Sequence, residues 1–286
     1  MDTILQDLRY GLRQLRKSPG FTAIAVLTLA LGIAINATMF SMVSAILLRR
    51  PPGVDPDRVA VVTSIDPASG FQADANQVSA PNFLAWRESN HVFSEMAAAD
   101  VFRTASLTSQ REAQSVRAAA VSANFFQVLG AAAERGRTFS AGEDQTGQDH
   151  VVILSHQLWE QRFASDASII GRNVRINREN YTVIGVMPAS FRLLGYASEL
   201  WLPLSLSPAD HSAAAHRDRS LYLFARMKPG VTIGQSRAEF ATLAQRAQSA
   251  FPETEKGWGA TVRTLPDFLV YSFGIRTGLA VIMTTV

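Results

Sequence analysis

The sequence predicts an α+β extracytoplasmic domain attached to an N-terminal transmembrane helix, and three observations lead to that prediction. Residues 21–48 carry no charged side chain. Charged residues make up only 18% of the chain, against about 25% in typical soluble proteins, as expected if part of the chain lies in a membrane. After residue 50, apolar strands and capped helices alternate with connections of uneven length. That pattern is typical of α+β or mixed sheets rather than of a regular doubly wound sheet.

Charge and composition exclude several functions. The 27 basic residues exceed the 24 acidic ones by a margin too small to favour nucleic-acid binding, so no nucleic-acid partner is expected. The chain contains no cysteine, which excludes disulfides and thiol chemistry.

The first segment, residues 1–20, is predicted to be a cytoplasmic amphipathic helix. Leucines recur at helical spacing on one face, arginines occupy another, and the Ser-Pro-Gly sequence at 18–20 ends the helix. An apolar stripe beside a basic face suits the headgroup layer, so membrane lipid is the expected partner. The alternative is a helix packed on another protein surface. The basic residues expected at the membrane interface are Arg9, Arg13, Arg16 and Lys17.

Residues 21–48 are predicted to form the transmembrane helix. A bilayer core needs about 20 residues of helix, whereas the apolar region of a cleavable signal peptide has only about 7–15. An uncleaved anchor is therefore favoured over a signal peptide or a buried core helix. The cations before the span outnumber Arg49 and Arg50 directly after it, so the positive-inside rule places the N-terminus in the cytoplasm.

Two residues in this span, Gly32 and Asn36, are candidates for helix packing. They lie four residues apart and so share one side of a helix. Small residues allow helices to approach closely in lipid, and an asparagine in hydrocarbon needs a hydrogen-bond partner. We expect a neighbouring helix at this face. The alternative is that Asn36 bonds to its own backbone.

Residues 51–270 are predicted to form a domain that mixes strands and helices. Helix N-caps are expected at Ser79, Ser122, Ser155 and Thr232, and Gly130 should end the second of these helices. Residues 173–176 and 181–187 should pair as a hairpin. Residues 136–149 and 208–220 are polar and are expected to be solvent-facing loops. The remaining strands are expected at residues 59–65, 151–154, 221–227 and 257–265.

Residues 271–286 are predicted to start a second transmembrane helix. The aromatic residues and Arg276 at 271–276 suit a membrane interface, and residues 277–286 are uncharged and mostly apolar. That apolar run is about half the length of a span. We expect a second span that begins here and is cut short by the end of the sequence. The alternative is a short apolar tail packed on the domain.

No constellation of catalytic residues is apparent, so the chain is not expected to be an enzyme or to hold a cofactor. The nucleophile elbow of hydrolases and the phosphate-binding loop of ATPases are both absent. The adjacent carboxylates Glu143 and Asp144 are expected to serve loop solvation rather than acid/base chemistry. The histidines show no metal-ligand spacing; they are His91, His150, His156, His211 and His216. The aromatic residues expected in the core are Trp86, Trp159, Trp201 and Phe125.

A series of segments along the chain carries a family resemblance. The N-terminal part contains DLRY (7–10), KSPGFT (17–22) and LTLALGI (27–33). The domain contains VSANFFQVLG (121–130), VILSHQLW (152–159), YTVIGVMP (181–188), LWLPL (200–204) and ARMKPGV (225–231). In order and spacing these segments resemble the MacB/FtsX-type ABC transporter permeases, most closely the acidobacterial duplicated permease group. The large domain is similar to the MacB-like periplasmic core domain.

The resemblance implies a periplasmic domain at residues 49–270 made of two subdomains, one inserted into the other. One subdomain would comprise roughly residues 49–117 plus 215–270, and the other residues 118–214. A bacterial inner-membrane location is implied, with a cytoplasmic ABC ATPase as a partner and with other permease helices or a second permease copy in contact.

The function implied is that of a permease subunit, here a fragment. It would couple ATP hydrolysis by the separate ATPase to movement of the periplasmic domain for efflux or export. The alternative is a complete single-span membrane protein whose extracytoplasmic domain binds a partner or ligand.

Overall fold

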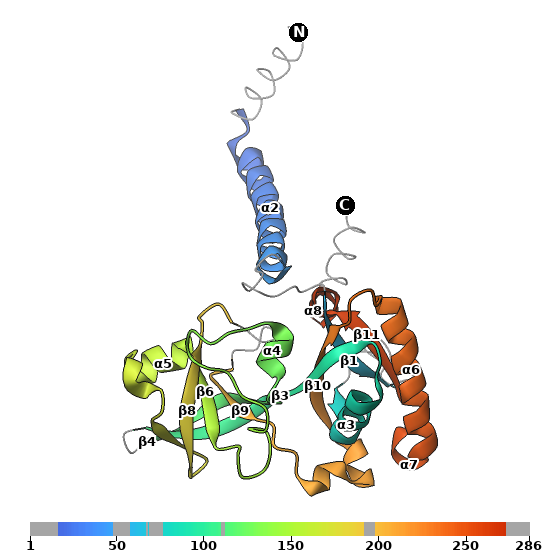
Figure 1. Cartoon of the computed structure of the whole chain (residues 1–286). Helices are drawn as coiled ribbons and strands as arrows, with labels where there is room; N and C mark the ends of the chain where they lie inside the picture. Colours follow the sequence, from blue (N-terminus) through green and yellow to red (C-terminus); the bar gives the residue numbers. More distant parts are fainter. Residues whose placement is uncertain are drawn as a thin grey trace. The chain divides into compact units, whose positions relative to one another are not determined.

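The computed structural model describes residues 17–47, 58–66, 68, 77–109, 112–191 and 198–272 (Figure 1). The chain divides into two compact units, Met1–Arg49 and Arg50–Val286. Of the amphipathic helix expected within residues 1–20, residues 1–16 lie outside the described residues.

The first unit contains one described helix, α2 (Pro19–Leu47). Its apolar side chains are exposed where they are described, among them Phe21 at 71% and Leu27 at 69%. Within the described residues, no helix combines the length and the apolarity that a membrane crossing requires. The transmembrane helix expected at residues 21–48 is therefore not confirmed by the structure and stays a prediction.

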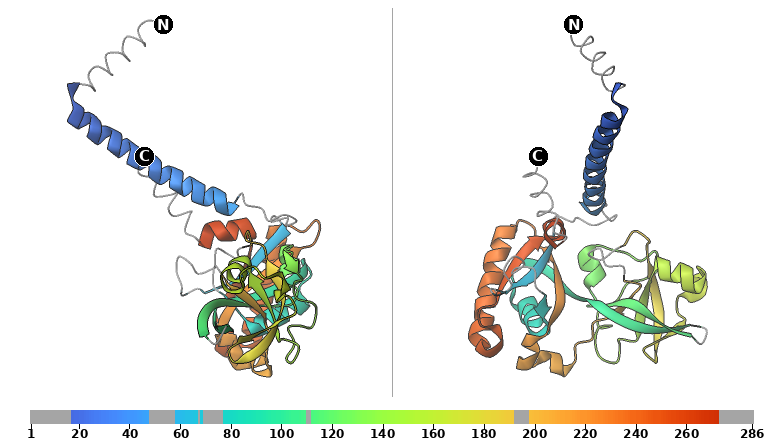
Figure 2. Two further views of the ribbon diagram at one scale, coloured as in Figure 1. Left: turned by 90° about the vertical axis from the view of Figure 1, so that its left-hand side faces the viewer. Right: turned by 180° about the vertical axis from the view of Figure 1, so that it is seen from behind.

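The second unit is built on one mixed sheet, and Figure 2 shows its strands and helices from two further sides. Its neighbouring strands follow the order β11-β1-β10-β3-β4-β9-β6-β8-β5, with β2 paired to β10 and β7 paired to β3 and β8. Most pairs are antiparallel, whereas β4–β9 and β6–β8 are parallel. The strands are β1 (Val59–Ile65), β2 (Val78–Ser79), β3 (Phe93–Ser109), β4 (Glu112–Val121), β5 (Arg135–Gly136), β6 (Val151–Ser155), β7 (Asn173–Ile176), β8 (Glu179–Met187), β9 (Leu200–Pro203), β10 (Arg219–Met227) and β11 (Gly259–Thr264).

Helices cover this sheet, which makes the domain a mixed α/β fold. They are α3 (Ala80–Ser89), α4 (Phe125–Leu129), α5 (His156–Phe163), α6 (Ile233–Ala250), α7 (Pro252–Glu255) and α8 (Leu265–Ser272). Three short 3₁₀ turns add to them: η3 (Ala167–Ile169), η4 (Pro208–His211) and η5 (Ala213–Arg217).

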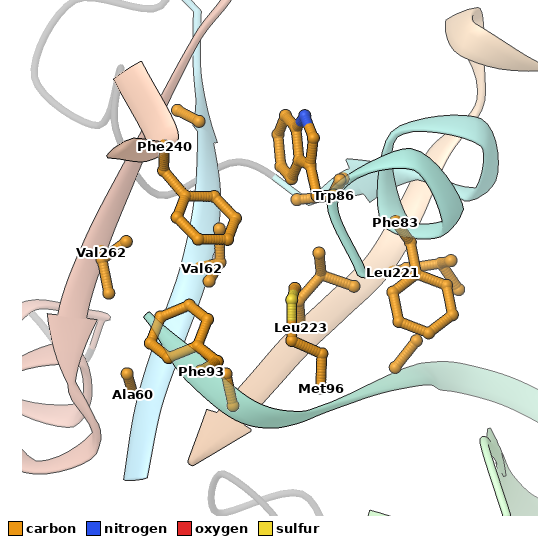
Figure 3. Close-up of a cluster of buried hydrophobic side chains, with 14 of the residues drawn as sticks. Ala60, Val62, Phe83, Trp86, Phe93, Met96, Leu221, Leu223, Phe240 and Val262 are labelled. Atoms are coloured by element: carbon orange, nitrogen blue, oxygen red, sulfur yellow. The ribbon is translucent and has the colours of Figure 1, made fainter. Parts of the chain in front are cut away.

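Strand β1 is buried on both faces, which explains why its residues 59–62 are all apolar. Successive side chains of a strand point to opposite faces. Ala60 and Val62 pack with residues of α3 and α6, including Trp86 and Phe240, as Figure 3 shows. Val59 and its neighbours on the other face pack with residues of α4 and α8. The β11-β1-β10 end of the sheet is therefore enclosed between two pairs of helices.

A separate hydrophobic cluster forms at the other end of the sheet. It joins the distal part of the β3–β4 hairpin to β6, β7, β8 and α5. Leu107 of β3 and Trp159 of α5 belong to it, whereas Ala97 and Ala99, nearer the start of β3, belong to the cluster around α4. Strand β3 thus runs from one core to the other, with a register irregularity between Asp100 and Arg103.

Strands β1 and β11 bring the two ends of the domain together. They pair antiparallel, and Ala60 near the start of β1 lies opposite Thr264 at the end of β11. The chain therefore enters and leaves this sheet at the same point.

Several predicted elements are confirmed. The strand at residues 59–65 and the hairpin of β7 and β8 are present. The Ser155 side chain accepts a hydrogen bond from the Leu158 backbone N–H, and Thr232 opens α6 with a capping box. The aromatic residues expected in the core are at most 4% exposed; they are Trp86, Trp159, Trp201 and Phe125.

Other predictions of local structure were wrong. Ser122 does not cap α4, because its hydroxyl accepts from the Ala98 backbone N–H at 2.9 Å and Asn124 takes the N-cap position. Ser79 is the N-cap of α3, as expected, although its side chain makes no capping hydrogen bond. The strand expected at 257–265 is shorter, since α8 begins at Leu265.

The loop expected at residues 208–220 is also not simply solvent-facing. It forms two 3₁₀ turns, η4 and η5, and then enters β10. The His216 side chain within it is only 3% exposed. The strands β3, β4 and β9 were not predicted at all.

Candidate functional site

The residues predicted to act in the membrane are only partly described. Lys17 is exposed, whereas Arg9, Arg13 and Arg16 lie outside the described residues. A Cβ atom added at Gly32 of α2 would meet no atom within 4 Å, so this face of the helix is open in the chain described. Asn36 lies in the same helix, and its side chain is outside the described part. The helix-packing role of Gly32 and Asn36 therefore stays a prediction.

The two adjacent carboxylates of the 136–149 loop diverge, as expected. Glu143 forms an ion pair with Arg137 at 2.6 Å and accepts from the Ser140 backbone N–H. The hydrogen bond from Arg137 lowers the pKa of Glu143 below its usual value. Asp144 instead accepts from the Ala123 backbone N–H at 2.9 Å. Both carboxylates hold loops in place, and they share no reaction site.

Three of the five histidines lie apart from one another and pair with neighbouring groups. The His91 ring lies 3.3 Å from Glu239, and the His156 ring lies 2.9 Å from Glu134. His150 stacks on Tyr181, with ring centroids 5.2 Å apart. In the part of the chain that the structure describes, no group of three or more possible metal ligands occurs.

His216 belongs to a buried polar cluster that sequence reasoning missed. Its Nδ1 lies 2.9 Å from Glu255 Oε1, and Arg219 donates to the same oxygen at 2.9 Å. The side chains of these three residues are 3%, 4% and 10% exposed. The Arg219 guanidinium also lies 3.7 Å over the Trp258 ring and donates to the His216 carbonyl. An ionised Glu255 carboxylate can only accept, so the tautomer of His216 that fits this contact has its proton on Nδ1.

Burial sets the electrostatics of this cluster. It lowers the pKa of Arg219, and the charge of Glu255 opposes that shift. His216 and Glu255 are 39 residues apart in sequence, and no spacing rule connects them. A histidine in a polar stretch gives no local signal of its burial, so only the tertiary structure identifies the cluster.

A groove lies beside this cluster and receives both His211 and His216. It is formed by α3, the C-terminal half of α6, and the turns η4 and η5. Its volume is about 340 Å³, within the range of about 300–1,000 Å³ that small-molecule pockets occupy. Trp86 from α3 and Leu243 from α6 contribute to its apolar lining, and Arg246 from α6 is one of its few polar members. The groove offers binding contacts, but no nucleophile paired with a base.

Comparison with known proteins agrees with this fold. Residues 22–243 match the sequence profile of the MacB-like periplasmic core domain. No curated protein sequence matches the chain. A domain assigned to a permease protein from Porphyromonas gingivalis is similar at a TM-score of 0.57, with 13% identity, 75% of this chain covered and 93% of that one. The periplasmic region of MacB from Actinobacillus actinomycetemcomitans gives a TM-score of 0.52 and 13% identity, with 79% and 97% covered. The two solved structures therefore share the fold of this chain's domain.

Proposed function

Because the chain belongs to the MacB-like periplasmic core domain family of MacB/FtsX-type ABC transporter permeases, we propose that it couples ATP hydrolysis by a separate cytoplasmic ATPase to movement of a periplasmic domain for efflux or export. The family match over residues 22–243 carries this proposal, and the shared fold supports it. Permease components of this family are not themselves enzymes, so the energy must come from a partner.

The proposed topology places the N-terminus in the cytoplasm, residues 21–48 in the inner membrane and residues 49–270 in the periplasm. The charge-free run of residues 21–48 supports it. The exposed apolar side chains of α2 also support this topology, because a large exposed apolar surface marks a site of contact with a membrane or another protein.

The absence of cysteine makes this topology directly testable. Ala241→Cys places one thiol on an exposed position of α6, and Thr3→Cys places one near the N-terminus. A membrane-impermeant maleimide should label Cys at position 241 in intact spheroplasts. It should label position 3 only after permeabilisation. The reverse labelling, or equal labelling of both, contradicts the proposed topology.

The division of the domain into two subdomains is also part of the proposal. We infer one subdomain from residues 49–117 plus 215–270 and a second, inserted one from residues 118–214. The presence of separate hydrophobic clusters around α6 and around α5 supports a division into two subdomains. The continuous strand β3 reaches into both clusters, so it would carry motion from one body to the other.

Coupling to an ATPase is tested by purification from native membranes. The tagged full chain should copurify with a polypeptide that contains a phosphate-binding loop. The purified fraction should hydrolyse ATP, and orthovanadate should inhibit that hydrolysis. A stable chain that purifies without ATPase activity would instead favour a single-span protein that binds a partner or ligand through its outer domain.

A further inference from the structure

The groove between α3 and α6 has apolar walls that are held in place by the core. Trp86 and Leu243 line it and are only 3% and 6% exposed, because their other sides pack in the cluster shown in Figure 3. Leu84 and Phe251 also contribute to the apolar surface, and Phe251 is 38% exposed. An apolar group placed here would be removed from water without rearrangement of the fold.

The charge at the groove comes from one residue. Among the described residues that line it, Arg246 is the one arginine or lysine, and there is no aspartate or glutamate. The neighbouring carboxylate, Glu255, is buried and accepts from both His216 and Arg219. It therefore offers nothing to a molecule in the groove.

Arg246 is the cation best placed to bind a ligand. It is exposed, and within the described part of the chain its side chain makes no hydrogen bond or ion pair. A guanidinium presents a planar set of donors that matches a carboxylate in a bidentate geometry. A free arginine beside an apolar wall thus favours a ligand that combines a carboxylate with a hydrocarbon part.

We propose that this groove binds a small amphiphilic carboxylate, with its hydrocarbon part against Leu84, Trp86 and Leu243 and its carboxylate on Arg246. The volume of about 340 Å³ suits a small molecule rather than a folded partner. This binding site goes beyond the proposed function and does not depend on coupling to an ATPase.

The test uses octanoate as the probe and the full chain kept soluble by an amphipathic polymer. Calorimetric titration at about pH 7.5, where a carboxylic acid is ionised, should detect binding of octanoate. Octylammonium has the same chain length and the opposite charge, and it should bind at least about tenfold more weakly. Titration of the polymer alone gives the background.

Matched variants locate the site. Arg246→Gln should weaken octanoate binding by about tenfold or more, because it removes a charge-assisted bond. Arg87→Gln removes an exposed cation of α3 that does not line the groove, and it should leave the affinity unchanged. Ala250→Glu adds a carboxylate at an exposed position of the lining and should abolish binding without changing the thermal unfolding of the chain.

Three results would overturn the inference. One is the absence of octanoate binding. Another is equal binding of octanoate and octylammonium, which would show that charge plays no part. The third is an unchanged affinity in Arg246→Gln and Ala250→Glu, which would place the octanoate elsewhere, for example on the exposed apolar face of α2.

Discussion

Replacing Glu255 with Gln should destabilise the domain by about 3 kcal/mol, because it leaves the guanidinium of Arg219 buried without its counter-charge. Glu255 is 4% exposed and Arg219 is 10% exposed, so water cannot replace the lost carboxylate. Opposite charges about 4 Å apart attract by about 4 kcal/mol at an effective dielectric constant near 20. Glutamine retains one acceptor oxygen, which recovers part of that loss through a neutral hydrogen bond.

The assay is urea unfolding of the full chain in detergent micelles, followed by tryptophan fluorescence. Trp258 is a suitable reporter because the Arg219 guanidinium lies 3.7 Å from its ring centroid. A loss of about 3 kcal/mol is large against the total stability of about 5–15 kcal/mol that domains usually have. It should therefore appear as a clear shift of the urea midpoint.

A double-mutant cycle separates the ion pair from general disruption. Arg219→Met removes the guanidinium partner of the buried Glu255 and leaves it only the His216 ring, so it should also destabilise strongly, whereas the double variant removes both charges. The double variant should therefore be more stable than the sum of the single effects predicts, by about 1–3 kcal/mol. If the effects add within about 0.5 kcal/mol, or if Glu255→Gln costs less than about 1 kcal/mol, the reasoning is refuted.

Three further predictions concern a strand glycine, a loop carboxylate and a helix cap of the domain. Gly185→Ala should destabilise it by about 1–3 kcal/mol in thermal melts, because a Cβ there would overlap the carbonyl oxygen of Arg137; a wild-type melting curve would contradict this. The lowered pKa of Glu143 means that its ion pair stabilises the fold above the ordinary value of 4.5 and that this stability is lost as the pH falls through the lowered pKa. Glu143→Gln should remove that part of the pH dependence of unfolding between about pH 6 and pH 3, and an unchanged profile would show that the pair contributes nothing. Ser155→Ala should cost about 1 kcal/mol in urea unfolding, since the Leu158 N–H loses its partner, while Ser155→Thr should retain most of the stability.

The parts of the fold that follow local rules could be predicted from the sequence. Strand β1 begins with four apolar residues, 59–62, because both of its faces are buried. The capping box of Thr232 and Gln235 marks the start of α6, and the Asn177–Arg178 pair forms the turn between β7 and β8 with positive φ angles of 51° and 74°. Each of these signals lies within a few residues of the element that it defines.

The parts that depend on distant contacts could not be predicted. Strand β3 contains a run of alanines at 97–99, which have low strand propensity, and their burial between the cores stabilises the strand instead. The partner of His216 lies on α7, far along the chain, so the turn that holds the histidine reads as a polar loop. The groove has the same origin, since α3, η5 and α6 contribute to it from separate parts of the sequence.

The pairing of Ala60 with Thr264 has a mechanical consequence. A pull that acts equally on the segments before β1 and after β11 reaches the sheet at one corner, so it displaces the domain as a body. A pull that separates those two segments would instead open the antiparallel pair from that corner, one hydrogen bond after another, rather than load all of its bonds together. The direction of the force on the segments before β1 and after β11 therefore decides whether the domain moves as a body or whether the β1–β11 pair begins to separate.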